Sequence, residues 1–317
     1  MMEMDLDQRS DAERFCPDPA PYAASYSDRS PGWLDELDLK LAPPHQRMGT
    51  HALDLADWFV IDEHRQRELE LRERLLTERR SKVFAVLPSA ESAAEEVFEL
   101  ISEWAAKRGL GALHDRTADA HPLIAAAQLV QDDLCLMVHR DGDWHLDGGV
   151  LTFPSVWKLT DKLGLPTAAV HDPVPHYAAE LAPKVDRFFD RLGVDRPVWR
   201  RSLSLKPTNA LYLPVSKAEA DPSTSITVND DGEPYWLRTE RQTLRRLPRT
   251  GAILFGIRTQ LAPVSVLRRR PDIAAALLAK YQSWDAAMNQ FKMADSDVSN
   301  NVLPWIARVA AGRPKAQ

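Results

Sequence analysis

The chain has 317 residues, of which 44% are hydrophobic and 27% are charged, and its formal net charge is -6. This profile is typical of a soluble globular protein that is large enough to bury a cavity. The mildly negative charge argues against a dedicated nucleic-acid binder. The two cysteines are too few for an iron–sulfur cluster or a structural zinc site, and they imply no disulfide framework.

The N-terminus is acidic and lacks an apolar core, so it does not resemble a signal peptide. No apolar run approaches the length of a membrane span. We therefore expect a cytoplasmic protein.

The first part of the chain is expected to be helical after a polar leader. Residues 1–32 are rich in Pro, Ser, Asp and Tyr, which predicts a flexible arm or a segment that wraps the body. A helical pattern then covers 33–80. Residues 89–109 predict an amphipathic helix with Ser89 as its N-cap and Gly109 at its end.

The remainder of the chain alternates strands with short helices. Residues 125–140 and 144–155 predict two strands joined by an Asp-Gly-Asp turn. The later elements are expected to be a helix over 155–164, a proline-stiffened corner over 171–175, a helix over 183–193, a strand over 196–206, a polar loop over 216–232, two strands over 234–247 and 251–262, and a helix over 271–288.

Consecutive strands joined by turns predict an α+β protein with an antiparallel sheet and flanking helices. Neither G-x-G-x-x-G nor G-x-x-x-x-G-K-[ST] is present, so nothing indicates a nucleotide site in this chain. We divide the chain into an arm (1–32), a single domain with a helical N-terminal extension (33–295) and a tail (296–317).

His171 lies in "VHDPVP", where two prolines stiffen the backbone. None of the nine histidines has metal-site spacing to another, but the axial ligand of a haem needs no spacing partner. His171 follows an apolar run and precedes a rigid corner, which suits that role. The alternative is a turn histidine without a ligand, and His176 competes for any ligand role.

The strand "RTERQTLRRLPR" places Arg238, Glu240 and Gln242 on one face. A carboxylate between a guanidinium and an amide could bind an ammonium substrate or relay a proton. The alternative is a solvated edge strand. The surplus arginines, Arg249 and Arg258 among them, are either solvated or anchor anionic groups such as haem propionates.

Several stretches resemble the haem-dependent oxidative N-demethylase family, and the match runs from about 45 to 290. They are "RMGTHALDLADWFVIDEHRQRELELRERLL" (47–76), "LVQDDLCLM" (129–137), "LTFPSVWKLTDKLGLP" (151–166), "VHDPVP" (170–175), "VDRFFDRL" (185–192), "RPVWRRS" (196–202) and "RTERQTLRRLPRTGAILFGIRT" (238–259).

This resemblance implies a PAS-like antiparallel sheet whose flanking helices enclose a pocket for haem b. It implies that His171 is the axial iron ligand and that Glu240 is the distal carboxylate that holds a small amine. The family oxidises dimethylamine with O₂, using electrons from NADPH through separate flavin and iron–sulfur components. We expect this chain to need such a reductase too, because it has no flavin, iron–sulfur or nucleotide site of its own.

One segment departs from the family. After "VWR" the resemblance predicts Ser-Asn-Trp, whereas this chain has "RSLS" (201–204), which could alter substrate choice if it lines the pocket. A haem-based gas or redox sensor on the same fold, without amine turnover, is the alternative function. A scaffold that has lost its haem is a further one.

Overall fold

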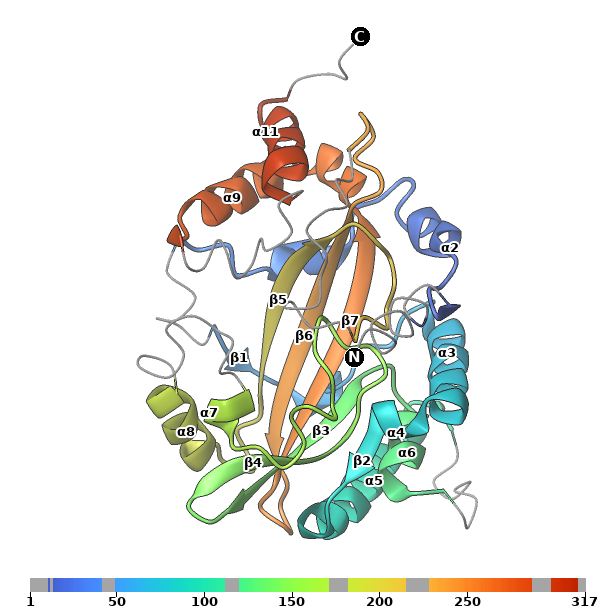
Figure 1. Ribbon diagram of the computed structural model, residues 1–317, viewed down its shortest axis with the longest axis vertical. Helices are drawn as coiled ribbons and strands as arrows, with labels where there is room; N and C mark the ends of the chain where they lie inside the picture. Colours follow the sequence, from blue (N-terminus) through green and yellow to red (C-terminus); the bar gives the residue numbers. More distant parts are fainter. Residues whose placement is uncertain are drawn as a thin grey trace, which may run out of the picture.

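The computed structural model describes residues 11, 14–41, 49–111, 120–170, 182–214, 228–286 and 298–312. In this part of the chain seven strands form one sheet, and all neighbouring strands run antiparallel (Figure 1). Their spatial order is β1 (His51–Ala52), β5 (Val198–Lys206), β6 (Trp236–Arg246), β7 (Ile253–Pro263), β3 (Asp133–Arg140), β4 (Asp143–Val150) and β2 (Phe84–Val86). The predicted combination of helices with an antiparallel sheet is confirmed.

Two hairpins build most of the sheet. β3 and β4 are joined at Asp141 and Gly142, both with positive φ (55° and 89°), as the tight turn of a twisted hairpin requires. β6 and β7 pair without interruption from Arg246 opposite Ile253 to Trp236 opposite Pro263. The hairpins meet where β3 pairs with β7, so the centre of the sheet joins segments that are far apart in the sequence.

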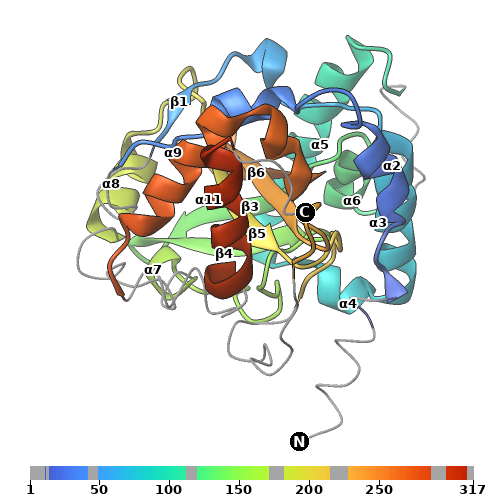
Figure 2. The same cartoon turned by 90° about the horizontal axis from the view of Figure 1, so that it is seen from above.

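The helices cover both sides of the sheet. They are α2 (Pro19–Ala24), α3 (Arg65–Glu78), α4 (Arg80–Val83), α5 (Glu91–Ala106), α6 (Pro122–Ala127), α7 (Thr167–Val170), α8 (Ala182–Arg191), α9 (Pro271–Gln282) and α11 (Leu303–Ala310). We call the face that bears Glu240 and Leu244 of β6 the front face, and the face that bears Arg241 and Thr243 the rear face. Seen from above, α7 and α5 lie on opposite sides of the sheet (Figure 2).

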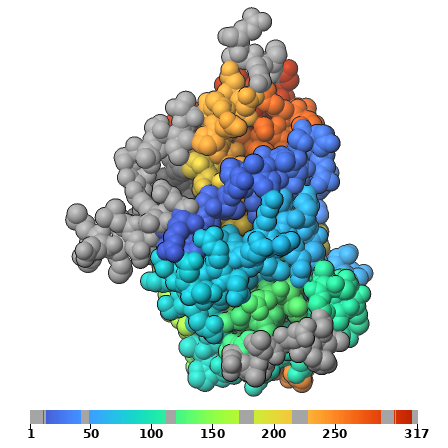
Figure 3. All heavy atoms as spheres, turned by 90° about the vertical axis from the view of Figure 1, so that its right-hand side faces the viewer, coloured from blue at the N-terminus to red at the C-terminus, as the bar shows by residue number. Residues whose placement is uncertain are grey.

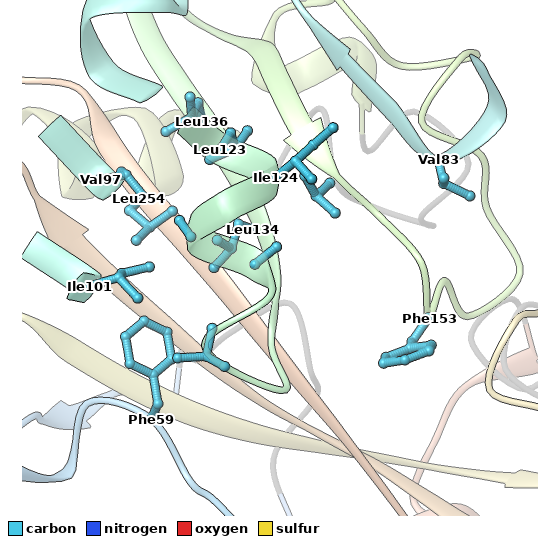
Figure 4. Packing of buried hydrophobic residues seen from close by; sticks show 14 of the residues in the cluster. Phe59, Val83, Val97, Ile101, Leu123, Ile124, Leu134, Leu136, Phe153 and Leu254 are labelled. Carbon is cyan, nitrogen blue, oxygen red and sulfur yellow. The ribbon is translucent and has the colours of Figure 1, made fainter. Parts of the chain in front are cut away.

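The largest apolar cluster lies on the rear face. α5 buries Val97 and Ile101, one helical turn apart, against Leu254 of β7 and Leu134 of β3, and Phe59 closes the cluster (Figure 4). Each such side chain contributes roughly 1.5–3 kcal/mol by leaving water. This packing fixes the rear of the sheet, so the front face of β6 is held in a defined position.

Three local predictions were wrong because tertiary contacts overrode the pattern. Ser89 does not cap α5, since its hydroxyl donates a 2.5 Å hydrogen bond to Asp147 Oδ2. Residues 155–164 form turns rather than a helix, because the backbone N–H of Val156 bonds to Leu213 O at 2.8 Å instead of continuing a helical ladder. The start of the predicted strand 125–140 is instead the end of α6.

The packed body extends beyond residues 33–295 on both sides. Phe15 and Tyr22 are buried, and the N-terminal segment lies across the surface beside α3 (Figure 3). Trp305 of α11 is 1% exposed and packs in a cluster with α9. In the described segments no helix has both the length and the apolar character needed to cross a bilayer.

Candidate functional site

A polar strip runs along the front face of β6. Glu240 is half-buried and lies directly between Ser202 of β5 and Thr259 of β7. Gln242 Nε2 donates a 2.9 Å hydrogen bond to Glu240 Oε2. Gln242 Oε1 accepts a 2.7 Å hydrogen bond from Arg200 Nε. Because β6 lies between β5 and β7, these half-buried side chains do not lie on a solvated edge strand.

Arg238 lies on the same strand but binds backbone. Its two Nη atoms donate bonds of 2.8–3.0 Å to the carbonyl oxygens of Phe153, Pro154, Ala210 and Leu211. Burial lowers its pKa to about 10, and the side chain is 1% exposed. Arg238 therefore ties the segments around 153–154 and 210–211 over one end of the polar strip.

The other end of the strip meets an apolar wall. Leu244 and Ile257, neighbours of Gln242 on β6 and β7, belong to a buried cluster that also contains Val185 and Phe189 of α8. Val170, the last residue of α7, packs against the same cluster. α7 and α8 are the described flanks of the segment that carries His171 and His176, and these two histidines lie outside the described residues.

The segment that departs from the family pattern lies beside Glu240. Ser202 is directly opposite Glu240, and Ser204 is directly opposite Arg238. Thr259 completes the row from the other side, and its buried hydroxyl has no hydrogen-bond partner. We did not single out Ser202 or Thr259 as site residues, although counting outward from the β6–β7 turn would have paired Thr259 with Glu240.

The two arginines considered for anionic groups are not brought to this strip. Arg258 is fully buried on the rear face, where it pairs with Asp62 at 2.6 Å and Glu68 at 2.8 Å. Against the opposing effect of burial, Arg258 lowers the pKa of Asp62 to about 2. Arg249 lies in the β6–β7 turn and pairs with Glu99 at 2.7 Å. Carboxylates thus hold both guanidinium groups.

His145 is a buried histidine of the described chain that has a free ring nitrogen. Its Nδ1 lies 3.0 Å from Gly164 O, and its Nε2 has no partner. It pairs with Val138, whose side chain packs against the rear cluster. Directly opposite residues share a face, so His145 is on the other side of the sheet from Glu240.

The front face combines apolar and polar side chains. Leu244, Ile257 and Phe189 are buried in one cluster next to half-buried polar groups, and the hydroxyl of Thr259 has no hydrogen-bond partner among the described residues. Haem sites in general combine apolar side chains with a few hydrogen-bonding groups.

Comparison with known families identifies the family of the chain. The sequence model described as haem-dependent oxidative N-demethylase, alpha subunit-like, matches residues 49–108 and 110–302. These ranges cover most of the chain, including β5, β6, β7 and the segment between α7 and α8. The chain therefore belongs to the haem-dependent oxidative N-demethylase alpha subunit-like family.

Proposed function

We propose that this protein removes a methyl group oxidatively from a small amine, using haem b, O₂ and electrons from a separate reductase. The observation that carries the proposal is the position of Glu240. Its carboxylate is half-buried on a central strand, is held by Gln242, and shares its face with the cluster into which the flanks of His171 pack.

His171 is the residue that would hold the iron of the haem, and the haem would supply the oxidising chemistry when it is bound. The sheet with its flanking helices is the proposed PAS-like enclosure. The adjacency of β3 and β7, the first and last of five consecutive strands, supports that arrangement. Because carboxylates hold Arg249 and Arg258, we assign no haem contact to either residue.

Glu240 binds the substrate ammonium and orients its methyl group. A partly desolvated carboxylate attracts a cation far more strongly than one in water. Gln242 fixes the direction of the carboxylate, and Arg238 holds the covering segments. The overall reaction is R–NH–CH₃ + O₂ + 2e⁻ + 2H⁺ → R–NH₂ + CH₂O + H₂O. The electrons come from a flavin and iron–sulfur partner, and we place the reaction in the cytoplasm.

A visible absorption spectrum with and without amines tests this function. We expect a Soret band in the haem-reconstituted protein, a shift of that band with small secondary amines, and formaldehyde when O₂ and reductant are added. A Soret band without an amine-dependent shift or formaldehyde would identify a haem sensor instead. A colourless chain would overturn both functions.

A further inference from the structure

A buried hydroxyl without a partner marks the front face beside Glu240. Thr259 is 0% exposed, and its Oγ1 makes no hydrogen bond to any residue that the structure describes. A buried hydroxyl that makes no hydrogen bond costs free energy, so it is expected to meet a ligand or water in the working protein.

The register places this hydroxyl next to Glu240. Thr259 is directly opposite Glu240 in the β6–β7 ladder, and such residues have Cβ atoms about 4.5–5.5 Å apart on one face. A nitrogen that hydrogen-bonds to both side chains requires their oxygens to be no more than about 6 Å apart. Side chains on directly opposite residues can meet that requirement.

The two side chains together offer two acceptors. Gln242 already occupies Glu240 Oε2, and within the described residues Oε1 accepts no hydrogen bond. A secondary ammonium group has two N–H donors, whereas a tertiary ammonium group has one. A protonated primary or secondary amine can therefore donate one hydrogen bond to Glu240 Oε1 and another to Thr259 Oγ1. A protonated tertiary amine can donate to only one of these two acceptors.

We propose that the hydroxyl of Thr259 accepts the second N–H of the substrate ammonium, beside Glu240, and so selects amines whose ammonium forms have at least two N–H bonds. This inference rests on the proposed function, because it assumes that Glu240 holds the amine.

Thr243 provides a matched control. It is also a fully buried threonine with an unpartnered hydroxyl, on the neighbouring strand. Its side chain lies on the rear face, where a Cβ at Gly256 would come within 2.6 Å of its Oγ1. Thr243→Val removes the same group from the same sheet without touching the front face.

The experiment titrates haem-loaded protein with dimethylammonium and trimethylammonium chloride and follows the Soret shift. Thr259→Val is expected to raise the dissociation constant of dimethylammonium about 10- to 100-fold and that of trimethylammonium less than about twofold. Thr259→Ser should retain binding, and Thr243→Val should leave both constants unchanged. The Tm of ligand-free Thr259→Val should equal or exceed that of the parent, because a partnerless hydroxyl is replaced by a methyl group of the same shape.

Three results would overturn the role of Thr259. Thr259→Val and Thr243→Val could change the dissociation constants equally, or Thr259→Val could weaken the binding of both amines equally. The third is a lower Tm in Thr259→Val alone. Glu240→Gln separates this failure from that of the proposed function. If Glu240→Gln no longer binds either amine, the role of the Glu240 carboxylate is supported, whatever the result for Thr259. Unchanged binding in Glu240→Gln would refute the proposed function itself.

Discussion

Nε2 of Gln242 donates a 2.9 Å hydrogen bond to Oε2 of Glu240, two residues away on the same face of β6. The orientation of the Gln242 amide is set in turn by Arg200, whose Nε lies 2.7 Å from its Oε1. These contacts leave Oε1 of Glu240 without a hydrogen bond from the described residues, and Oε1 is therefore the oxygen that we propose for the substrate.

Glu240→Gln is expected to retain haem and lose turnover. The substitution keeps the shape but removes the charge proposed to hold the ammonium, and a hydrogen bond to a charged group contributes about 1.5–3 kcal/mol. We therefore predict a fall in kcat/KM of about 10- to 100-fold or more. Formaldehyde release measured at a fixed haem content checks this. Unchanged turnover would remove Glu240 from the mechanism.

His171→Ala is expected to abolish the Soret band of the reconstituted protein, because His171 is the residue proposed to hold the iron. His145→Ala is the control, since His145 is buried and has a free Nε2 but lies on the rear side of the sheet. If His145→Ala loses the band and His171→Ala keeps it, the ligand has been assigned to the wrong histidine.

Arg238→Met is expected to destabilise the fold. It removes the guanidinium donor from the carbonyl oxygens of Phe153, Ala210 and Leu211, whereas Pro154 O keeps its 3.2 Å bond from the backbone N–H of Leu213. The loss costs roughly 3–5 kcal/mol. Urea unfolding should show the loss. Arg249→Gln, at an exposed ion pair in the β6–β7 turn, should leave the unfolding midpoint unchanged.

Asp132 predicts a dependence of stability on pH. Burial raises its pKa to about 7 from an ordinary value of 3.8, and neither carboxylate oxygen has a hydrogen-bond partner. The proton is bound more tightly in the folded state. The contribution of Asp132 to the free energy of unfolding is therefore fully present below pH 3.8 and is lost as the pH rises through about 7. The loss in the free energy of unfolding is on the order of 4 kcal/mol.

Asp132→Asn is neutral at every pH, so its gain in Tm over the parent should be larger at pH 8 than at pH 5. Asp133→Asn is the contrasting variant. The Asp133 carboxylate accepts bonds of 2.7–2.9 Å from Thr152 and Phe153, so its replacement should lower Tm at both pH values. A parent protein with equal stability at pH 5 and pH 8 would contradict a protonated Asp132.

Arg258→Met is expected to cost about 3–5 kcal/mol, because it leaves the buried Glu68 and the half-buried Asp62 without their counter-charge. The haem content of the folded fraction should not change, since Arg258 is on the rear face. Circular dichroism melting and the ratio of Soret to protein absorbance measure the two effects separately. Loss of haem without loss of stability would restore a role for Arg258 at the cofactor.

The local pattern of the sequence was enough to predict those structural features that depend only on residues close together in the chain. The period of two along a strand put Arg238, Glu240 and Gln242 on one face, and the Asp-Gly turn at 141–142 joined β3 to β4. These features follow from backbone geometry over a few residues, so they survive in any fold that keeps the strands.

Tertiary structure alone decided the contacts between distant segments. The pairing of β3 with β7 put Arg258 on a rear face already supplied with Asp62 and Glu68. The crossing of two loops over β6 gave Arg238 backbone carbonyls instead of a ligand. A charged side chain that leaves water must take whichever partners the packing supplies, and those partners come from parts of the chain that local periodicity does not connect.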